Sequence, residues 1–154
     1  MKTVLVVGCL KSNLLMNTQI DKVKFIIYHP PYWDIIKFSD NKKDLSNCET
    51  IEDFNKSFGE VIDNTTKHLV KNRYCACVIG DKYASSEIVP LGFHCMNLLL
   101  SKGFKLKAIL VKNFHETKGK SNQKAIWRYS ALASDFYLFK HKYIFLFKKV
   151  KAKA

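Results

Sequence analysis

The residues best suited to chemistry form one short run, His29-Pro30-Pro31-Tyr32-Trp33, directly after the apolar segment 23–28. Proline fixes φ and has no N–H, so two prolines in a row leave a rigid turn whose carbonyls are free to accept hydrogen bonds. Aromatic rings follow at once. An acceptor held beside an aromatic face suits the amino group of a planar base stacked on the ring. The alternative interpretation is a purely structural turn.

Other residue types that often carry chemistry form no recognisable pattern. Cys75 and Cys77 make a C-x-C pair inside an apolar run, without a second Cys/His pair at zinc-finger spacing, so we predict no metal site. His68 and His94 fall in helical patterns and are expected to be surface or core side chains. The sequence has neither a P-loop nor the G-x-G-x-x-G of dinucleotide-binding folds.

The composition indicates a globular, strongly basic protein. The chain has 154 residues, 47% of them hydrophobic and 25% charged, which predicts one domain over 1–154. Its net charge of +13 suits a polyanion such as nucleic acid or an acidic membrane. Only Arg73 and Arg128 are arginine, so most of this charge comes without bidentate base readout.

No apolar run approaches the roughly 18 residues of a membrane-spanning helix, so we expect no membrane partner. The five cysteines are odd in number and lie mostly in apolar segments, which favours reduced thiols and a cytoplasmic protein.

The elements that must position the His29 turn alternate between strands and helices. We expect strands at 3–7, 23–28, 73–79, 105–112 and 143–149, and helices at 50–72 and 87–102, with N-caps at Thr50 and Ser86. This order predicts an α/β fold with a mostly parallel sheet of about five strands and two main helices. The C-terminal strand should be antiparallel because no crossover helix precedes it. The His29 turn and Gly80-Asp81 then share the carboxyl edge of the sheet, where ligands bind.

The strand followed by His29-Pro30-Pro31-Tyr32 resembles the (D/N/S)-P-P-(Y/F/W) motif of the amino-methyltransferases that act on adenine N6 or cytosine N4, most of them DNA methyltransferases. The resemblance covers about 3–149. It continues through PPYWDIIKFSDNKKDLSN, TIEDF, RYCACVIGDKY, VPLGFHCMNLLLSKGFKLKAI and HKYIFLFKK, in the family's order. It implies a partial Rossmann-like methyltransferase sheet.

The resemblance also implies residue roles. A flipped base would stack on Tyr32, and its amine would donate to the Pro30 carbonyl and the side chain at position 29, facing S-adenosylmethionine. The implied catalytic residues are His29, Pro30, Pro31 and Tyr32. The implied walls of the base pocket are Trp33, Asp34 and Asp81. The implied contacts on the cofactor side are Gly8, His29 and Pro30.

Basic residues on the loop after the turn, in the variable segment 113–135 and in the Gly80–Tyr83 turn at the same sheet edge are expected to contact DNA phosphates, with one tryptophan able to stack on a base. The expected DNA-binding residues are Lys37, Lys42, Lys43, Lys82, Lys118, Lys120, Lys124, Trp127 and Arg128. The alternative is that these segments are solvated loops, with Trp127 in the core.

The chain departs from the family's pattern at two points. His29 stands where the family has Asp, Asn or Ser, and no F-x-G-x-G cofactor loop is present, since Gly8 stands alone about 20 residues before the turn. We therefore expect the catalytic half only, with the cofactor half on a second chain and an exposed apolar edge at 4–7 or 23–28. Two alternatives stay open: an inactive, decayed methyltransferase that binds nucleic acid, and a methyltransferase acting on RNA or protein.

Overall fold

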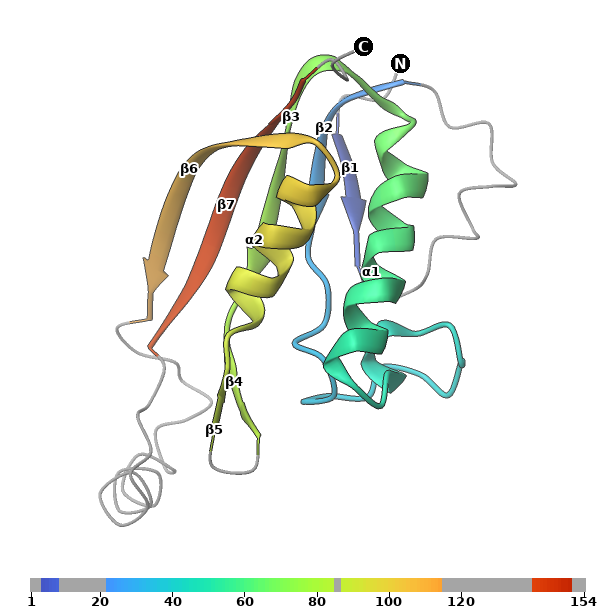
Figure 1. The fold of residues 1–154 in the computed structure, drawn as a ribbon, viewed down its shortest axis with the longest axis vertical. Helices are drawn as coiled ribbons and strands as arrows, with labels where there is room; N and C mark the ends of the chain where they lie inside the picture. Colours follow the sequence, from blue (N-terminus) through green and yellow to red (C-terminus); the bar gives the residue numbers. More distant parts are fainter. Residues whose placement is uncertain (1–3, 9–21, 85–86, 115–139, 151–154) are drawn as a thin grey trace.

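A five-stranded mixed sheet forms the centre of the computed structural model, which describes residues 4–8, 22–84, 87–114 and 140–150 (Figure 1). The strands lie in the order β1-β2-β3-β7-β6. Strands β1, β2 and β3 are parallel, and β7 is antiparallel to both β3 and β6. The predicted mostly parallel sheet with an antiparallel C-terminal strand is confirmed. Its strands are β1 (Val4–Val7), β2 (Val23–Tyr28), β3 (Leu69–Ile79), β6 (Phe104–Asn113) and β7 (His141–Lys149).

Two helices, α1 (Ile51–Thr66) and α2 (Leu91–Ser101), pack against each other and against one face of the sheet. Alternate side chains of the central strands face them, so that Cys75 and Cys77 of β3 and Phe145 and Phe147 of β7 are fully buried. Apolar residues of both helices complete this core, among them Phe54, Phe58, Ile62, Leu91, Cys95 and Leu99. The core fixes the strand ends that carry the His29 turn.

Helix α1 begins as predicted and ends earlier than predicted. The Thr50 hydroxyl accepts a hydrogen bond from the Asp53 N–H at 3.1 Å and so caps the first turn. The prediction that the helix continues to about residue 72 is wrong, because Leu69 is already the first, buried residue of β3. Lys149 holds this junction by donating to the carbonyls of Thr66 (2.6 Å) and Leu69 (2.7 Å).

Helix α2 begins at Leu91, so the predicted start at residue 87 is wrong. A short hairpin precedes it, formed by β4 (Lys82–Ala84) and β5 (Glu87–Val89). Proline restricts the residue before it to extended conformations, which keeps Val89 in the strand. Pro90 occupies the N-cap position without a side-chain hydrogen bond. Gly103, with φ of 82°, follows the end of the helix as expected.

Strand β1 forms one edge of the sheet, and its Val4 and Val6 are 46% and 67% exposed. The predicted apolar edge therefore lies at 4–7, while 23–28 is interior because β2 pairs on both sides. The opposite edge is β6. Among the described residues, no helix combines the length and the apolar character needed to cross a membrane.

Candidate functional site

The His29 turn lies at the carboxyl end of β2, between the ends of β1 and β3. The His29 N–H donates to the carbonyl of Val7 at 2.8 Å and extends the pairing with β1 to the first residue of the turn. Pro30 and Pro31 are buried, whereas the side chain of His29 is exposed and that of Tyr32 is partly buried. The prolines therefore anchor the turn and leave the two rings at its surface.

Tyr32 lies against the end of the neighbouring strand. A side chain at Gly80 would bring its Cβ within 3.2 Å of Tyr32 Cε2, so the absence of a side chain there makes room for the ring. The rings of His29 and Tyr32 meet edge to face, with centroids 6.4 Å apart and planes at 83°. The structure thus brings the turn and Gly80 together, as their places after adjacent strands predicted.

The site keeps both rings uncharged near neutral pH. Partial burial, together with the positive charge of Lys142, lowers the pKa of His29 below its ordinary value. A neutral imidazole donates from one nitrogen and accepts at the other. Partial burial likewise raises the pKa of the Tyr32 phenol. His29 can therefore accept a hydrogen bond from an amine.

Trp33 and Asp34 form a small cluster with Lys82. Trp33 has a left-handed backbone, with φ of 55°, and its indole Nε1 donates to the Cys48 carbonyl at 2.7 Å. The Lys82 ammonium lies 4.2 Å from the centroid of the Trp33 ring and pairs with the Asp34 carboxylate. Lys82 is only 8% exposed. The Lys82 ammonium therefore interacts with groups of the protein itself, whereas the sequence led us to expect a contact with a DNA phosphate.

Asp81 lies at the same edge and joins three elements. Its Oδ1 accepts a hydrogen bond from the Gly92 N–H at 2.9 Å, which caps the start of α2 with a negative charge. It also lies beside Tyr143 of β7, whose pKa is raised by partial burial and by the Asp81 charge. Asp81, expected from the sequence in the base pocket, thus links α2 and β7 at this edge of the sheet.

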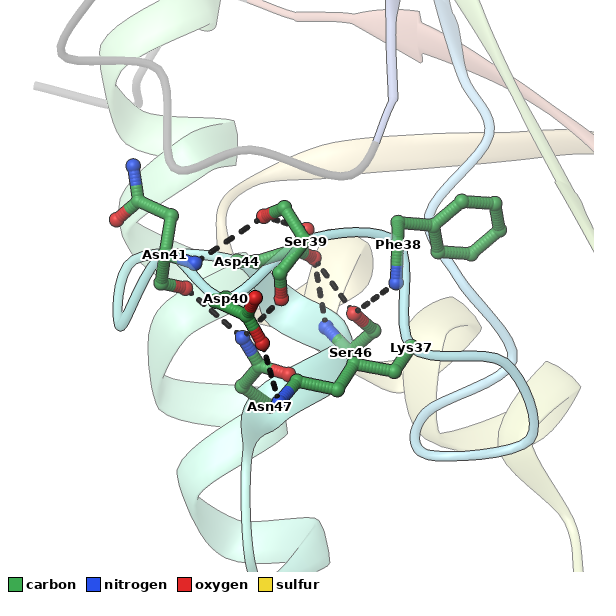
Figure 2. A network of polar contacts seen from close by, with 8 residues as sticks. All are labelled: Lys37, Phe38, Ser39, Asp40, Asn41, Asp44, Ser46 and Asn47. Atoms are coloured by element: carbon green, nitrogen blue, oxygen red, sulfur yellow. Dashed lines mark hydrogen bonds and ion pairs between the residues drawn. The ribbon is translucent and has the colours of Figure 1, made fainter.

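The loop after Trp33 has little regular structure but a well-connected interior (Figure 2). The Asp44 carboxylate, 2% exposed, accepts from the Ser46 N–H at 3.0 Å, the Ser46 hydroxyl at 2.9 Å and the Ser39 hydroxyl at 2.8 Å. The amide of Asn47 donates to the carbonyls of Ser39 (2.8 Å) and Asn41 (2.9 Å). These bonds fix the backbone of 38–47, including the 3-10 turn Leu45–Asn47.

Sequence reasoning missed this network. The signal was the density of Ser, Asp and Asn between 39 and 47, since these side chains bond to nearby backbone in turns.

The expected DNA-binding lysines have different surroundings. Lys37, Lys42 and Lys43 are exposed on this loop, and Lys37 pairs with Asp40 at 2.8 Å. The other expected contacts, Lys118, Lys120, Lys124, Trp127 and Arg128, lie outside the described residues. The residues that flank that segment are held together by a 2.7 Å hydrogen bond from the Phe114 N–H to the Lys140 carbonyl.

The described residues do not by themselves fit S-adenosylmethionine. Gly8 follows β1 at the same edge of the sheet as the His29 turn. A Cβ placed on Gly8 would meet nothing within 4 Å, so the described residues form no binding cradle around it. Within the ranges that the structure describes, no group of three or more His, Cys, Asp or Glu side chains could hold a metal ion. The turn therefore presents the His29 imidazole, which is exposed, and the Tyr32 ring, which is partly exposed.

Solved structures share this architecture. No protein-family model matches the sequence, and no curated protein is significantly similar to it. TTHA0409 of Thermus thermophilus, which carries the name "Putative DNA Modification Methylase", matches with a TM-score of 0.62 and 17% identity over 100% of this chain and 56% of its own. The chain has the fold of part of a DNA modification methylase.

The same protein in complex with S-adenosyl-L-methionine matches with a TM-score of 0.62 and 17% identity, over 99% of this chain and 57% of its own. The M1.HpyAVI–SAM complex matches with a TM-score of 0.52 and 15% identity, over 98% of this chain and 55% of its own. The methyltransferase sheet expected from the sequence is thus confirmed. The chain spans little more than half the length of these methylases.

Proposed function

We propose that this chain is the base-binding half of an S-adenosylmethionine-dependent methyltransferase that acts on the exocyclic amino group of adenine or cytosine in DNA. One observation carries the proposal. The His29-Pro30-Pro31-Tyr32 turn closes an interior strand at the carboxyl edge of a methylase-type sheet, beside the end of β3. This edge is where open α/β sheets bind ligands.

The turn has the groups needed to hold an amino base. A flipped base stacks on the Tyr32 ring, and its amine donates to the Pro30 carbonyl and to the neutral imidazole of His29. Acceptors for both N–H bonds direct the nitrogen lone pair toward the methyl group that it receives, and the His29 imidazole can take the proton that the nitrogen loses. When bound, S-adenosylmethionine supplies an electrophilic methyl group. The chain's contribution is to fix the nitrogen in line with that group.

A cofactor-binding segment is needed besides the described residues, because the surroundings of Gly8 provide no cradle. We propose that a second polypeptide segment, with an F-x-G-x-G loop, supplies it and docks against the single unit formed by 1–154. Strand β1 is one of the two described edges of the sheet, with Val4 and Val6 exposed, and we propose that the second segment pairs there. DNA would be held by the lysine-rich loops, with Lys42 and Lys43 exposed on the loop that follows the turn.

Reconstitution tests the proposal. The chain is mixed with the polypeptide encoded by a neighbouring reading frame that contains F-x-G-x-G, and transfer of a tritiated methyl group to DNA, RNA and protein is compared. We expect labelled DNA from the pair and none from either half. Isothermal titration of the chain alone with S-adenosylmethionine should give no heat. Silence from the complete pair on DNA would contradict the proposal, and label in RNA or protein would reassign the substrate.

Two variants test the proposed roles of Tyr32 and His29 in the same methyl-transfer assay. Tyr32→Ala should abolish transfer because the stacking face is lost. His29→Asp, which restores the family's acidic acceptor, should raise it. Lys24→Gln, an exposed change within β2 and away from the turn, is the matched control and should leave the rate unchanged.

A second function is favoured by His29 and by the open surroundings of Gly8. A non-catalytic nucleic-acid-binding module would keep the basic loops without the transfer reaction. Such a module binds DNA with a steep loss of affinity as salt increases. It would stay inactive in the reconstituted pair even with His29→Asp, and this result separates it from the methyltransferase.

A further inference from the structure

Three large apolar side chains project from the loop that follows the base-binding turn. Ile35, Ile36 and Phe38 are 53%, 60% and 55% exposed, although they lie within four consecutive positions. Single exposed apolar residues are ordinary on protein surfaces, whereas a local group of this size marks a contact surface. We name Ile35, Ile36 and Phe38 the apolar tip.

The apolar tip begins directly beside the candidate base site. The Ile35 N–H donates to the carbonyl of Tyr32 at 3.4 Å, so the chain turns back on itself between the stacking ring and the tip. A molecule that contacts the partly exposed Tyr32 side chain is therefore close to Ile35 as well.

The apolar tip is held on a fixed backbone. The Phe38 N–H donates to the Ser46 hydroxyl at 3.1 Å, and this hydroxyl donates in turn to buried Asp44. Figure 2 shows the Phe38 ring directed away from this network. The network uses the polar groups of the loop and leaves the apolar side chain outside. Because this surface is already ordered before binding, association does not carry the entropic cost of ordering it.

The charges around the tip favour DNA over a protein partner. Lys37 lies between Ile36 and Phe38 in the sequence, and Lys42 and Lys43 follow the tip. All three lysines are exposed. Asp40 is the one exposed acid between 35 and 43, and it pairs with Lys37. Protein interfaces are depleted of lysine at their apolar centre. The acid that precedes the tip, Asp34, is also exposed but pairs with Lys82, so the exposed charges outside an ion pair in the described stretch 34–43 are Lys42 and Lys43. An apolar group followed by such lysines suits a base stack lined by phosphates.

We propose that Ile35, Ile36 and Phe38 act as a wedge that enters the DNA base stack next to the nucleotide held at Tyr32. Enzymes that act on a base must take it out of the stack, and DNA-bending proteins insert Phe, Ile or Leu between base steps in this way. The wedge occupies the space that the flipped base leaves. The proposal rests on the proposed function, because it takes DNA as the substrate.

The test compares two duplexes of the same sequence, one fully paired and one with a single abasic site, by fluorescence anisotropy at low salt. The abasic duplex already contains the gap, so the chain should bind it about tenfold more tightly. The double variant Ile36→Ser/Phe38→Ser should bring this ratio close to one. Its affinity for the paired duplex should stay within about twofold, because lysine–phosphate contacts dominate there.

Two controls separate the wedge from other effects. Ile109→Ser, an equally exposed apolar residue on β6, should leave the ratio unchanged. Lys42→Gln/Lys43→Gln should weaken binding to both duplexes equally. Circular dichroism of every variant checks that the fold is intact.

The other possible outcomes distinguish failure of the wedge from failure of the proposed DNA substrate. Equal binding of the native chain to both duplexes overturns the wedge and leaves the proposed methyltransferase standing. A variant that keeps the abasic preference but no longer associates with the cofactor half assigns the tip to a protein contact instead. Absence of binding to either duplex overturns the wedge and the proposed DNA substrate together.

Discussion

Replacing Gly92 by alanine tests the packing that joins α2 to β7 beside the candidate site. A Cβ at this position would lie 2.5 Å from Tyr143 Cδ2, 2.9 Å from Tyr143 Cε2 and 3.3 Å from the capping Oδ1 of Asp81. Carbon atoms in normal contact are about 3.5–4.0 Å apart. The Tyr143 ring must therefore move, or α2 must shift away from the sheet.

The ring has little freedom to move. It stacks on Phe145 with centroids 5.4 Å apart and planes at 27°, and Phe93 meets it edge-on at 5.7 Å. Overpacking of this kind costs about 1–3 kcal/mol. Alanine recovers up to about 1 kcal/mol of helix propensity, and less than that in the first turn. We expect Gly92→Ala to lower the free energy of unfolding by about 1–2 kcal/mol.

Gly59→Ala in α1 is the matched control. Its Cβ would meet Leu98 Cδ1 and Lys102 Cε at 3.6 Å, which is ordinary contact, so the propensity gain should raise stability by about 0.5–1 kcal/mol. Urea denaturation followed by circular dichroism should place the two midpoints roughly 1 M apart. A Gly92→Ala protein as stable as Gly59→Ala, with an unchanged m-value, would refute the packing argument.

Three further changes probe other contacts. Asp81→Ala should cost about 1 kcal/mol of unfolding free energy in urea because the Gly92 N–H loses its cap, and Asp81→Asn should cost less because its amide oxygen still accepts. Asp34→Asn should cost about 1–2 kcal/mol by leaving the buried Lys82 ammonium unpaired, and adding Lys82→Met should recover most of it in a double-mutant cycle. Burial raises the pKa of Tyr28 above its ordinary value of about 10, so the unfolded chain loses this proton first. Thermal stability should therefore fall as the pH rises above about 10, and less steeply in Tyr28→Phe.

Each of these three has a clear contrary result. Equal losses in Asp81→Ala and Asp81→Asn would remove the cap as the explanation. A Lys82→Met change that deepens the loss in Asp34→Asn would mean that the ion pair is not what holds Lys82. Identical alkaline slopes for the native chain and Tyr28→Phe would show that this phenol is not linked to folding.

Patterns local in the chain predicted most of the fold. The spacing of Thr50 and Asp53 correctly located the start of α1, and the apolar runs located the strands. The end of α1 was wrong because Leu69 lies four positions after Thr65 and continues the helical period, although it belongs to β3. The hairpin before α2 was missed because its strands have three residues each. Pro90 carried the available signal, since the residue before a proline is rarely helical.

The chemistry of the site was predicted in part. The place of the His29 turn beside Gly80 follows from strand order and needs only the sequence. The burial of Lys82 depends on the Trp33 ring and the Asp34 carboxylate meeting it across the sheet edge, and no spacing in the sequence encodes that meeting. Solvation of a lysine is a property of its three-dimensional neighbours. The positive charge of Lys82 and its place at the carboxyl edge of the sheet therefore led to the expectation that it contacts DNA.

The position of β7 has a consequence for how the protein is made. It is the last described strand to leave the ribosome, yet it lies between β3 and β6, which are synthesised much earlier. Until β7 emerges, the nascent chain exposes two unpaired strand edges, one of them rich in Ile, Leu and Val. Pairing between segments so distant in sequence is slow. Because β6 pairs with no other described strand, it joins the sheet only when β7 has paired with β3.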